Sequence, residues 1–217
     1  MSSRRIAVVL ALVLAAVPAV GQARGRQDQA PPQYQPIVWH RSVALGPPWA
    51  GRLAHGVQLP PEGPDFFTWD PILDRSPDRG WRRWGHDRLI RTLLRVLSEY
   101  RLAHPEASRV GVEDIARPHG GPFGERFGGV GHQSHQNGLD VDVLYPRADG
   151  LERRSFRPTQ IDFFLAQDLV DRFVRAGARY VFVGPHTDLA GPPRIVQPLI
   201  YHDEHMHVRL RPRPHGR

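Results

Sequence analysis

The stretch Gly131-His132-Gln133-Ser134-His135-Gln136-Asn137-Gly138-Leu139-Asp140-Val141-Asp142-Val143 combines histidines, carboxylates and alternating apolar residues. A second segment near the C-terminus belongs with it: His202-Asp203-Glu204-His205-Met206-His207-Val208-Arg209-Leu210. Five of the twelve histidines fall in these two segments, in a chain that has no cysteine and far more arginine than lysine. This concentration of imidazole groups indicates a chemical role.

The C-terminal segment has the pattern of a strand. His205, His207 and Arg209 are spaced two residues apart, and the positions between them are apolar. This is the period of a strand with one apolar face. Both imidazoles therefore point to the same side.

The first segment predicts another strand, with two acids on one face. Gly138 can supply a turn, and Asp140 and Asp142 then alternate with valines, as in a half-buried strand. If the two strands are neighbours, imidazole and carboxylate groups meet on their polar faces. This is the ligand set that suits Zn²⁺, which in catalytic sites has three protein ligands and an open position for water. The alternative is a set of hydrogen-bonded polar residues at a strand end.

At this point the sequence resembles a known family. The spacings Ser-His-x6-Asp, here Ser134-His135 to Asp142, and His-x-His, here His205 to His207, resemble the zinc motifs of one metallopeptidase superfamily. That superfamily includes lysostaphin, the D-Ala-D-Ala metallopeptidases and the Hedgehog fold. Within it, the longer segments 131–142 and 205–211 are most similar to the penicillin-insensitive murein endopeptidases. The likeness continues upstream through shorter segments, including Val112-Glu113-Asp114, and covers residues 42–211.

This resemblance implies that zinc is held by His135, Asp142 and His207. Alternation alone leaves both Asp140 and Asp142 facing the metal; the family pattern selects Asp142, and Asp140 can orient a ligand histidine instead. His205 has no ligand role in that pattern, so we assign it to proton transfer or to stabilising the oxyanion. Because the chain has no His-Glu-x-x-His helix, a histidine is expected to replace the usual glutamate general base.

Two further histidines lie close to the motifs and match family positions. His132 is expected as an additional metal ligand and His202 as an additional catalytic residue. Support for the site, a second metal or a place in an exposed loop are the alternatives. Nothing in the sequence pairs His119, His186 or His215 with the motifs, so they are left out of the site.

The N-terminus has the pattern of a secretory signal peptide. Two arginines precede an apolar run from Ile6 to Val20, and small residues follow up to Ala23, which predicts a signal peptide at 1–23. The run is shorter than a comfortable spanning helix, so an uncleaved anchor is the less favoured alternative and no stable membrane insertion is expected after cleavage. Residues 24–36 are rich in Gln and Pro and should form a flexible leader before a zinc peptidase domain at 37–217.

The charge of the chain limits its partners. The formal net charge is +7, and the domain stays basic without the signal peptide, so it should be attracted to polyanionic surfaces such as a cell wall. No nucleic-acid partner is expected, because the sequence contains no run of basic residues interleaved with aromatics and no nucleic-acid-binding module. Without cysteines, stability must come from the core and the metal rather than from disulfides.

The remaining pattern predicts an α+β fold. An apolar stripe predicts a helix from about Asp87 to His104, and Thr159 and Asp162 resemble a capping box before a second helix that Gly177 ends. Further short strands are expected at 110–112 and 179–183. With no βαβ alternation, these elements favour a mostly antiparallel sheet flanked by helices. The resemblance implies the same, a Hedgehog/D-Ala-D-Ala-peptidase-like fold.

The resemblance also implies a function. It predicts a periplasmic or secreted, zinc-dependent peptidoglycan endopeptidase that hydrolyses D-alanyl–meso-diaminopimelyl cross-links. One alternative is a zinc D,D- or L,D-carboxypeptidase that trims stem peptides, and another is a non-catalytic wall-binding module of the same fold. The presence of His205 beside a complete ligand set argues against the binding module. The oligomeric state is left open.

Overall fold

The computed structural model describes residues 33–125 and 132–212. The expected signal peptide, most of the expected leader, residues 126–131 and His215 lie outside the described residues. Their assignments, and the predicted domain limits, stay predictions. Within the part of the chain that is described, no helix is both long and apolar enough to cross a membrane.

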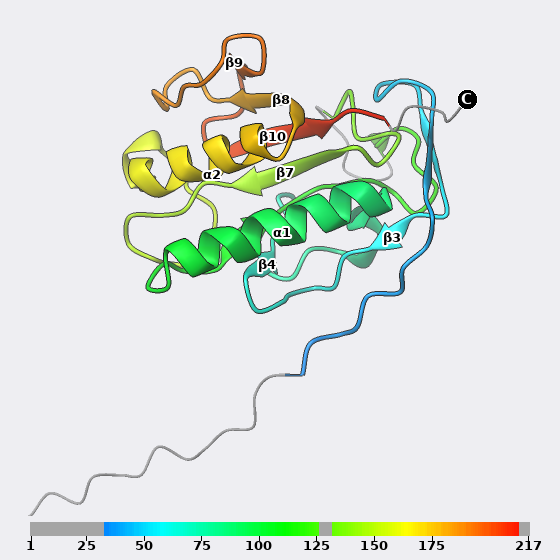
Figure 1. Cartoon of the computed structure of the whole chain (residues 1–217), viewed down its shortest axis with the longest axis horizontal. Coiled ribbons are helices and arrows are strands. Elements are labelled where there is room, and N and C mark those ends of the chain that lie inside the picture. The colour runs from blue at the N-terminus through cyan, green and yellow to red at the C-terminus, as the bar shows by residue number, and fades with distance from the viewer. Residues whose placement is uncertain (1–32, 126–131, 213–217) are drawn as a thin grey trace, which may run out of the picture. The chain divides into compact units, whose positions relative to one another are not determined.

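A six-stranded mixed sheet forms the centre of the fold (Figure 1). Its strands are β4 (Phe66–Thr68), β6 (Val110–Val112), β7 (Asp140–Leu144), β8 (Ala178–Val183), β9 (Val196–Pro198) and β10 (His205–Leu210). Their order in the sheet is β4-β6-β7-β10-β8-β9. The three central pairings are antiparallel, and the two outer ones, β4 with β6 and β8 with β9, are parallel. The predicted α+β class is therefore confirmed, with parallel pairing confined to the edges.

Smaller elements surround this sheet. β1 (Val43–Leu45) pairs antiparallel with β2 (Arg52–Ala54), and β3 (Val57–Gln58) pairs antiparallel with β5 (Trp84–Gly85). A 3-10 turn, η1 (Gly80–Arg82), leads into β5. These short pieces carry the chain to the first long helix.

Helix α1 (Asp87–Ala103) occupies nearly all of the range predicted for it. The side chain of His86 caps its N-terminus by accepting a hydrogen bond from a backbone N–H of the first turn. Most of the apolar stripe, including Leu93 and Leu97, is fully buried, and Leu94 packs against the core while partly buried. The helix ends just before Pro105, because proline has no N–H to donate and its ring clashes with the preceding turn.

Helix α2 (Phe163–Arg175) begins differently from the prediction. Asp162 is its N-cap, and the carboxylate accepts a hydrogen bond from a backbone N–H of the first turn at 3.0 Å. Thr159 lies instead in a separate 3-10 turn, η3 (Pro158–Gln160), so the predicted capping box is wrong. Gly177 follows the helix with a φ of +86°, a backbone conformation that glycine adopts without strain, and confirms the predicted stop.

Both helices cover the same face of the sheet (Figure 1) and enclose the main core with the apolar side chains of the central strands. Val141 of β7 and Val208 of β10 belong to this core and are fully buried. Because side chains alternate along a strand, the histidines and acids between them point to the opposite face. That face is also covered, since Asp140 and Asp142 are 0% and 3% exposed. The prediction that this strand is only half-buried is therefore wrong.

Candidate metal centre

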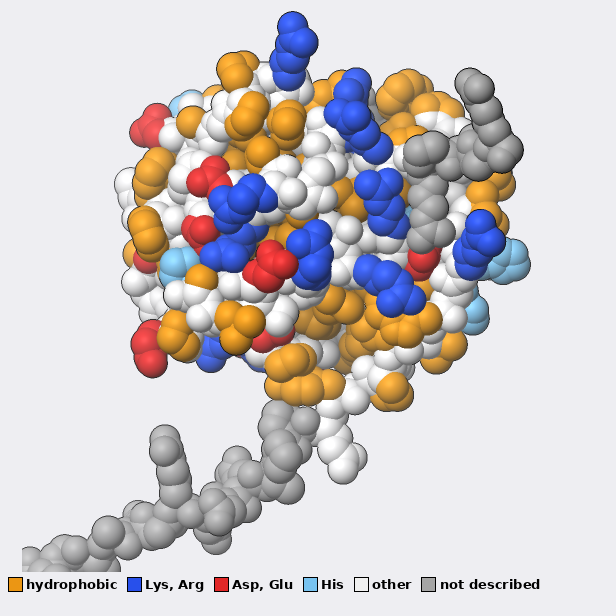
Figure 2. Space-filling model, in the orientation of Figure 1, with side chains coloured by type: hydrophobic (Ala, Val, Ile, Leu, Met, Phe, Trp, Pro, Cys, Tyr) orange, Lys and Arg blue, Asp and Glu red, His pale blue; other side chains and the backbone are white. Residues whose placement is uncertain are grey.

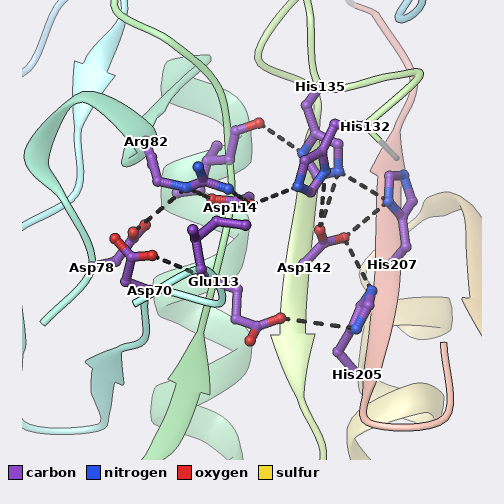
Figure 3. Close-up of polar contacts among 12 residues, drawn as sticks. Asp70, Asp78, Arg82, Glu113, Asp114, His132, His135, Asp142, His205 and His207 are labelled. Carbon is purple, nitrogen blue, oxygen red and sulfur yellow. Dashed lines mark hydrogen bonds and ion pairs between the residues drawn. The ribbon is translucent and has the colours of Figure 1, made fainter. Parts of the chain in front are cut away.

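Strand pairing brings the two sequence motifs together. β10 runs antiparallel to β7, with His207 opposite Asp142 and Arg209 opposite Asp140. The Nδ1 atom of His207 lies 2.9 Å from Oδ1 of Asp142 (Figure 3). The two strands are therefore neighbours, as the hypothesis of a shared polar face required.

His135 reaches the same point from the loop before β7. Its backbone has a φ of +66°, which is uncommon for a residue with a Cβ and is a form of strain found at functional sites. Gly138 completes the turn with a φ of +74°; a Cβ there would lie 2.9 Å from the backbone nitrogen of His86. The chain can therefore enter β7 at this angle only with glycine at 138.

The three side chains lie pairwise at distances that suit neighbouring zinc ligands, with His207 next to Oδ1 of Asp142 and His135 next to Oδ2. Nε2 of His135 lies 3.2 Å from Nδ1 of His207 and 3.3 Å from Oδ2 of Asp142. Ligand atoms about 2.0–2.1 Å from zinc in a tetrahedral arrangement are about 3.3–3.4 Å from one another. Two imidazole nitrogens and a carboxylate are also donors that zinc prefers. The residues present therefore fit the metal that the motifs imply.

Hydrogen bonds on the outer side of the two imidazoles fix their orientation. Nδ1–H of His135 donates to the carbonyl oxygen of Ile115 at 2.8 Å. Nε2–H of His207 donates to Oδ1 of Asp140 at 2.7 Å, and the guanidinium of Arg209 donates to the same oxygen. Each ring therefore turns its other nitrogen inward, which is the arrangement seen around metal-bound histidines. Asp140 holds the orienting position expected for it.

His132 approaches the cluster from another side. The ligand atoms of His132, His135 and Asp142 all lie within 4.8 Å of one another. Its Nδ1 is 4.0 Å from Oδ2 of Asp142, while its Nε2 is 2.8 Å from Oδ2 of Asp114. Asp114 in turn accepts two hydrogen bonds from the guanidinium of Arg82. Figure 3 shows this chain of contacts from Arg82 through Asp114 to His132.

His205 and His202 lie beside the cluster. Nε2 of His205 is 3.9 Å from Oδ1 of Asp142, and its side chain is 13% exposed. The ring of His202 is centred 4.8 Å from that of His205, and its Nδ1–H donates to the carbonyl oxygen of Ile200 at 2.8 Å. The structure thus places these two histidines next to the three convergent side chains, where a group can act without binding the metal.

The histidines left out of the site lie elsewhere. His119 is exposed. His186 is 74% exposed and its Nδ1 lies 2.7 Å from Oδ2 of Asp203. Neither has a recorded contact with the cluster among the described residues.

Comparison with known protein families identifies the family of this chain. The sequence model of a family described as penicillin-insensitive murein endopeptidase matches residues 44–189, which is more than half of the chain. The chain belongs to this family.

Individual murein endopeptidases are similar over most of the sequence. The penicillin-insensitive murein endopeptidase of Pectobacterium atrosepticum is 31% identical over 213 residues, which cover 80% of this chain and 71% of that protein. That of Yersinia pestis bv. Antiqua is 29% identical over 196 residues, covering 78% of this chain and 68% of that protein. The resemblance drawn from the motifs is confirmed at the level of the family.

In this murein endopeptidase family member, the charges of the cluster are strongly coupled. Burial alone would raise the pKa of Asp142, but His135 and His205 outweigh it and hold the pKa well below its usual value. Burial lowers the pKa of His207, yet its hydrogen bonds to the carboxylates of Asp140 and Asp142 raise it to about 9. The carboxylate of Asp142 is therefore ionised at neutral pH, the form in which a carboxylate can bind a metal.

The two neighbouring histidines shift in opposite directions. Burial lowers the pKa of His205, but nearby carboxylates, Asp142 foremost, raise it to about 9. Burial and the adjacent His205 lower the pKa of His202 to about 4. At neutral pH His205 therefore carries a proton that His202 lacks, and titratable pairs of this kind are typical of acid–base sites.

The sequence analysis missed the roles of Asp114 and Arg82. Both side chains are 0% exposed and form an ion pair. Asp114 of this pair contacts Nε2 of His132. A signal was present, because Glu113 and Asp114 are two consecutive acids that directly follow the buried strand β6. Acids in such a position are rarely buried unless they are paired.

We expect Arg82→Met to lower the free energy of unfolding by about 3–5 kcal/mol, because it leaves the buried carboxylate of Asp114 without its cation. Urea unfolding of the purified protein measures the change. The matched control is Arg95→Met, which removes an exposed ion pair to Glu99 on α1 and should cost less than about 1 kcal/mol. Equal effects of the two substitutions would show that the buried ion pair has no special importance.

Proposed function

We propose that this chain is a zinc-dependent peptidoglycan endopeptidase that hydrolyses D-alanyl–meso-diaminopimelyl cross-links. The observation that carries the proposal is the convergence of His135, Asp142 and His207 at distances of 2.9–3.3 Å. Membership of the murein endopeptidase family supports a peptidase that acts on the cell wall. Because the relatives are named penicillin-insensitive, we expect that penicillin does not inhibit this chain.

In this proposal the metal ligands are His135, Asp142 and His207, with His132 as a further ligand. Zinc bound there would polarise the carbonyl group of the scissile amide and lower the pKa of a water molecule to about 7. Asp140 and Asp114 would keep the imidazoles turned toward the metal.

His205 is proposed as the proton-transfer group. Its Nε2 faces the cluster, and before a metal binds the nearby carboxylates, Asp142 foremost, raise its pKa to about 9, so it can hold a proton. It can donate that proton to the oxyanion or to the nitrogen of the leaving amine. His202 is neutral under the same conditions and is proposed as a second catalytic residue, a proton acceptor beside His205.

We propose that the chain acts on its substrate outside the cytoplasm, in the periplasm or after secretion. The segment 1–23 is proposed as the export signal. The net charge of +7 supports a polyanionic wall as the partner. Figure 2 shows that cationic side chains are spread over the face that carries α1 and α2. Because they are dispersed among acids and apolar groups, they favour general attraction to a polyanion over a nucleic-acid site.

The test is digestion of purified cross-linked muropeptide dimers by the zinc-loaded chain, followed by chromatography. We expect the dimers to fall to monomers. A chelator should abolish the reaction and added zinc should restore it. Penicillin should have no effect, because no serine nucleophile takes part for a β-lactam to acylate.

Other outcomes identify the alternatives. Intact dimers with shortened free stem peptides would indicate a carboxypeptidase. Unchanged muropeptides in the presence of fully bound zinc would indicate a binding module. Hydrolysis that persists in the chelator, with no metal left on the protein, would contradict the metal-dependent mechanism itself.

A further inference from the structure

Four buried polar atoms in and beside the metal cluster lack a hydrogen-bond partner among the described residues, and two of them, besides Oδ2 of Asp140 and Oδ1 of Asp142, belong to neighbouring side chains. These two are Oε1 of Glu113 and Nδ1 of His205. The other carboxylate oxygen of Glu113, Oε2, lies 3.8 Å from this same Nδ1 (Figure 3). Unpaired buried polar groups are rare because they lose their hydrogen bonds to water without replacement. Here a carboxylate acceptor and a ring nitrogen that can donate lie next to each other.

We propose that Glu113 is a positioning residue for His205, whose Nδ1–H donates a hydrogen bond to the Glu113 carboxylate. When the ring holds a single proton, the bond keeps that proton on Nδ1, and it turns Nε2 toward Asp142, from which Nε2 is 3.9 Å away. Nε2 is then the nitrogen that exchanges a proton with the substrate. This role rests on the proposed function, in which His205 is the proton-transfer group. The contact between Glu113 and His205 does not depend on that function.

The backbone around Glu113 is rigid enough for this task. Its N–H donates to the carbonyl oxygen of Asp142 at 2.9 Å, and the N–H of Asp142 donates to the carbonyl oxygen of Asp114 at 3.0 Å. These bonds extend the pairing of β6 with β7. Glu113 is therefore fixed to the strand that supplies the metal-binding carboxylate, and supporting groups on strands hold a site more exactly than groups on loops.

Glu204 is the competing partner, because its Oε1 lies 3.7 Å from the same nitrogen of His205. The side chain of Glu204 is 34% exposed, however, whereas that of Glu113 is 4% exposed. Water can satisfy the carboxylate of Glu204, but the buried carboxyl group of Glu113 has to find its hydrogen-bond partner within the protein. Burial therefore favours Glu113 as the residue that sets the orientation of the ring.

The experiment compares Glu113→Leu, Glu113→Gln and the control Glu204→Leu in the zinc-loaded full chain. Leucine fills the buried space without an acceptor, and glutamine restores an acceptor oxygen. Three quantities are measured: zinc per chain, kcat and KM on muropeptide dimers, and the ¹⁵N shifts of the His205 ring, which report the protonated nitrogen and are assigned through His205→Ala.

We expect every variant to keep its zinc. In Glu113→Leu, kcat should fall about 10–100-fold, as for the loss of other supporting partners, while KM changes less than about threefold. In spectra recorded above the ring pKa of about 9, where one ring proton remains, that proton should move from Nδ1 to Nε2. Glu113→Gln should recover part of kcat and show a mixture of both ring forms, because its amide can accept or donate. Glu204→Leu should match the unsubstituted chain in all three measurements.

A purely structural Glu113 would give the opposite result, since leucine packs well and would leave both kcat and the ring proton unchanged; that result overturns the proposal. The same ring signals in the unsubstituted chain and in Glu113→Gln would also overturn it, and this comparison decides the matter if the leucine variant does not fold. If the unsubstituted zinc-loaded chain hydrolyses nothing while the ring proton still depends on Glu113, the proposed function fails and the contact stands.

Discussion

The His207→Ala protein is expected to lose its zinc and, with it, at least about 10³-fold of its activity on cross-linked muropeptides. Nδ1 of His207 is one of the three convergent donors, and its Nε2–H is held by Asp140. Lewis-acid catalysis is worth several kcal/mol, and each 1.4 kcal/mol or so is a factor of about ten in rate. Metal analysis after gel filtration, together with dimer digestion, measures both losses.

The matched control for this prediction is His40→Ala, which removes an exposed histidine in the segment before β1. It should retain one zinc per chain and full activity, so that any loss in His207→Ala cannot be attributed to fewer imidazoles. A His207→Ala protein with full zinc content would refute the ligand assignment. The same measurement applies to His135→Ala and Asp142→Asn, for which we expect the same result.

The His205→Ala protein, by contrast, should keep its zinc and lose about 10²–10⁴-fold in kcat, the range for removal of a general acid or base. His205 lies beside the donors and not among them: its Nε2 is 3.9 Å from Asp142, while His207 approaches the same carboxylate to 2.9 Å. Its burial and raised pKa of about 9 equip it to hold a proton next to the reacting amide. Steady-state kinetics at measured zinc content tests the prediction.

For this variant the control is His186→Ala, because His186 is exposed and pairs with Asp203 outside the cluster. Its kinetics should be those of the unsubstituted chain. Activity of His205→Ala within a few-fold of that control, at equal zinc content, would remove His205 from the mechanism. Loss of zinc from His205→Ala would instead place this residue among the ligands.

The sequence by itself determined the local elements of the site. The apolar stripe of α1 and the alternation in β7 and β10 depend only on the spacing of residues that are close in the chain, so their periods could be read directly. Gly138 could likewise be recognised as a turn because few other residues adopt a positive φ. The spacing of His135 and Asp142, and of His205 and His207, then matched a family whose membership the comparisons confirm.

The tertiary structure gives the physical reason why one of two similar acids faces the cluster, a choice that alternation left open and that only the family resemblance had made. Alternation puts Asp140 and Asp142 on one face of β7, but the register with β10 sets Asp142 opposite His207 and Asp140 opposite Arg209. Asp142 therefore joins the convergent donors, and Asp140 binds the outer nitrogen of His207. Register depends on pairing between distant segments, which no local period contains.

The same reason explains why the supporting residues were missed. Arg82, Glu113 and Asp114 are ordinary charged residues in the sequence, and charged side chains are mostly exposed. Only the pairing of β6 with β7, and the contact of η1 with the segment after β6, make them 0–3% exposed. Only burial makes a carboxylate depend on one particular partner. The pairing of Asp114 with Arg82 and His132, and the position of Glu113 beside His205, follow from that burial.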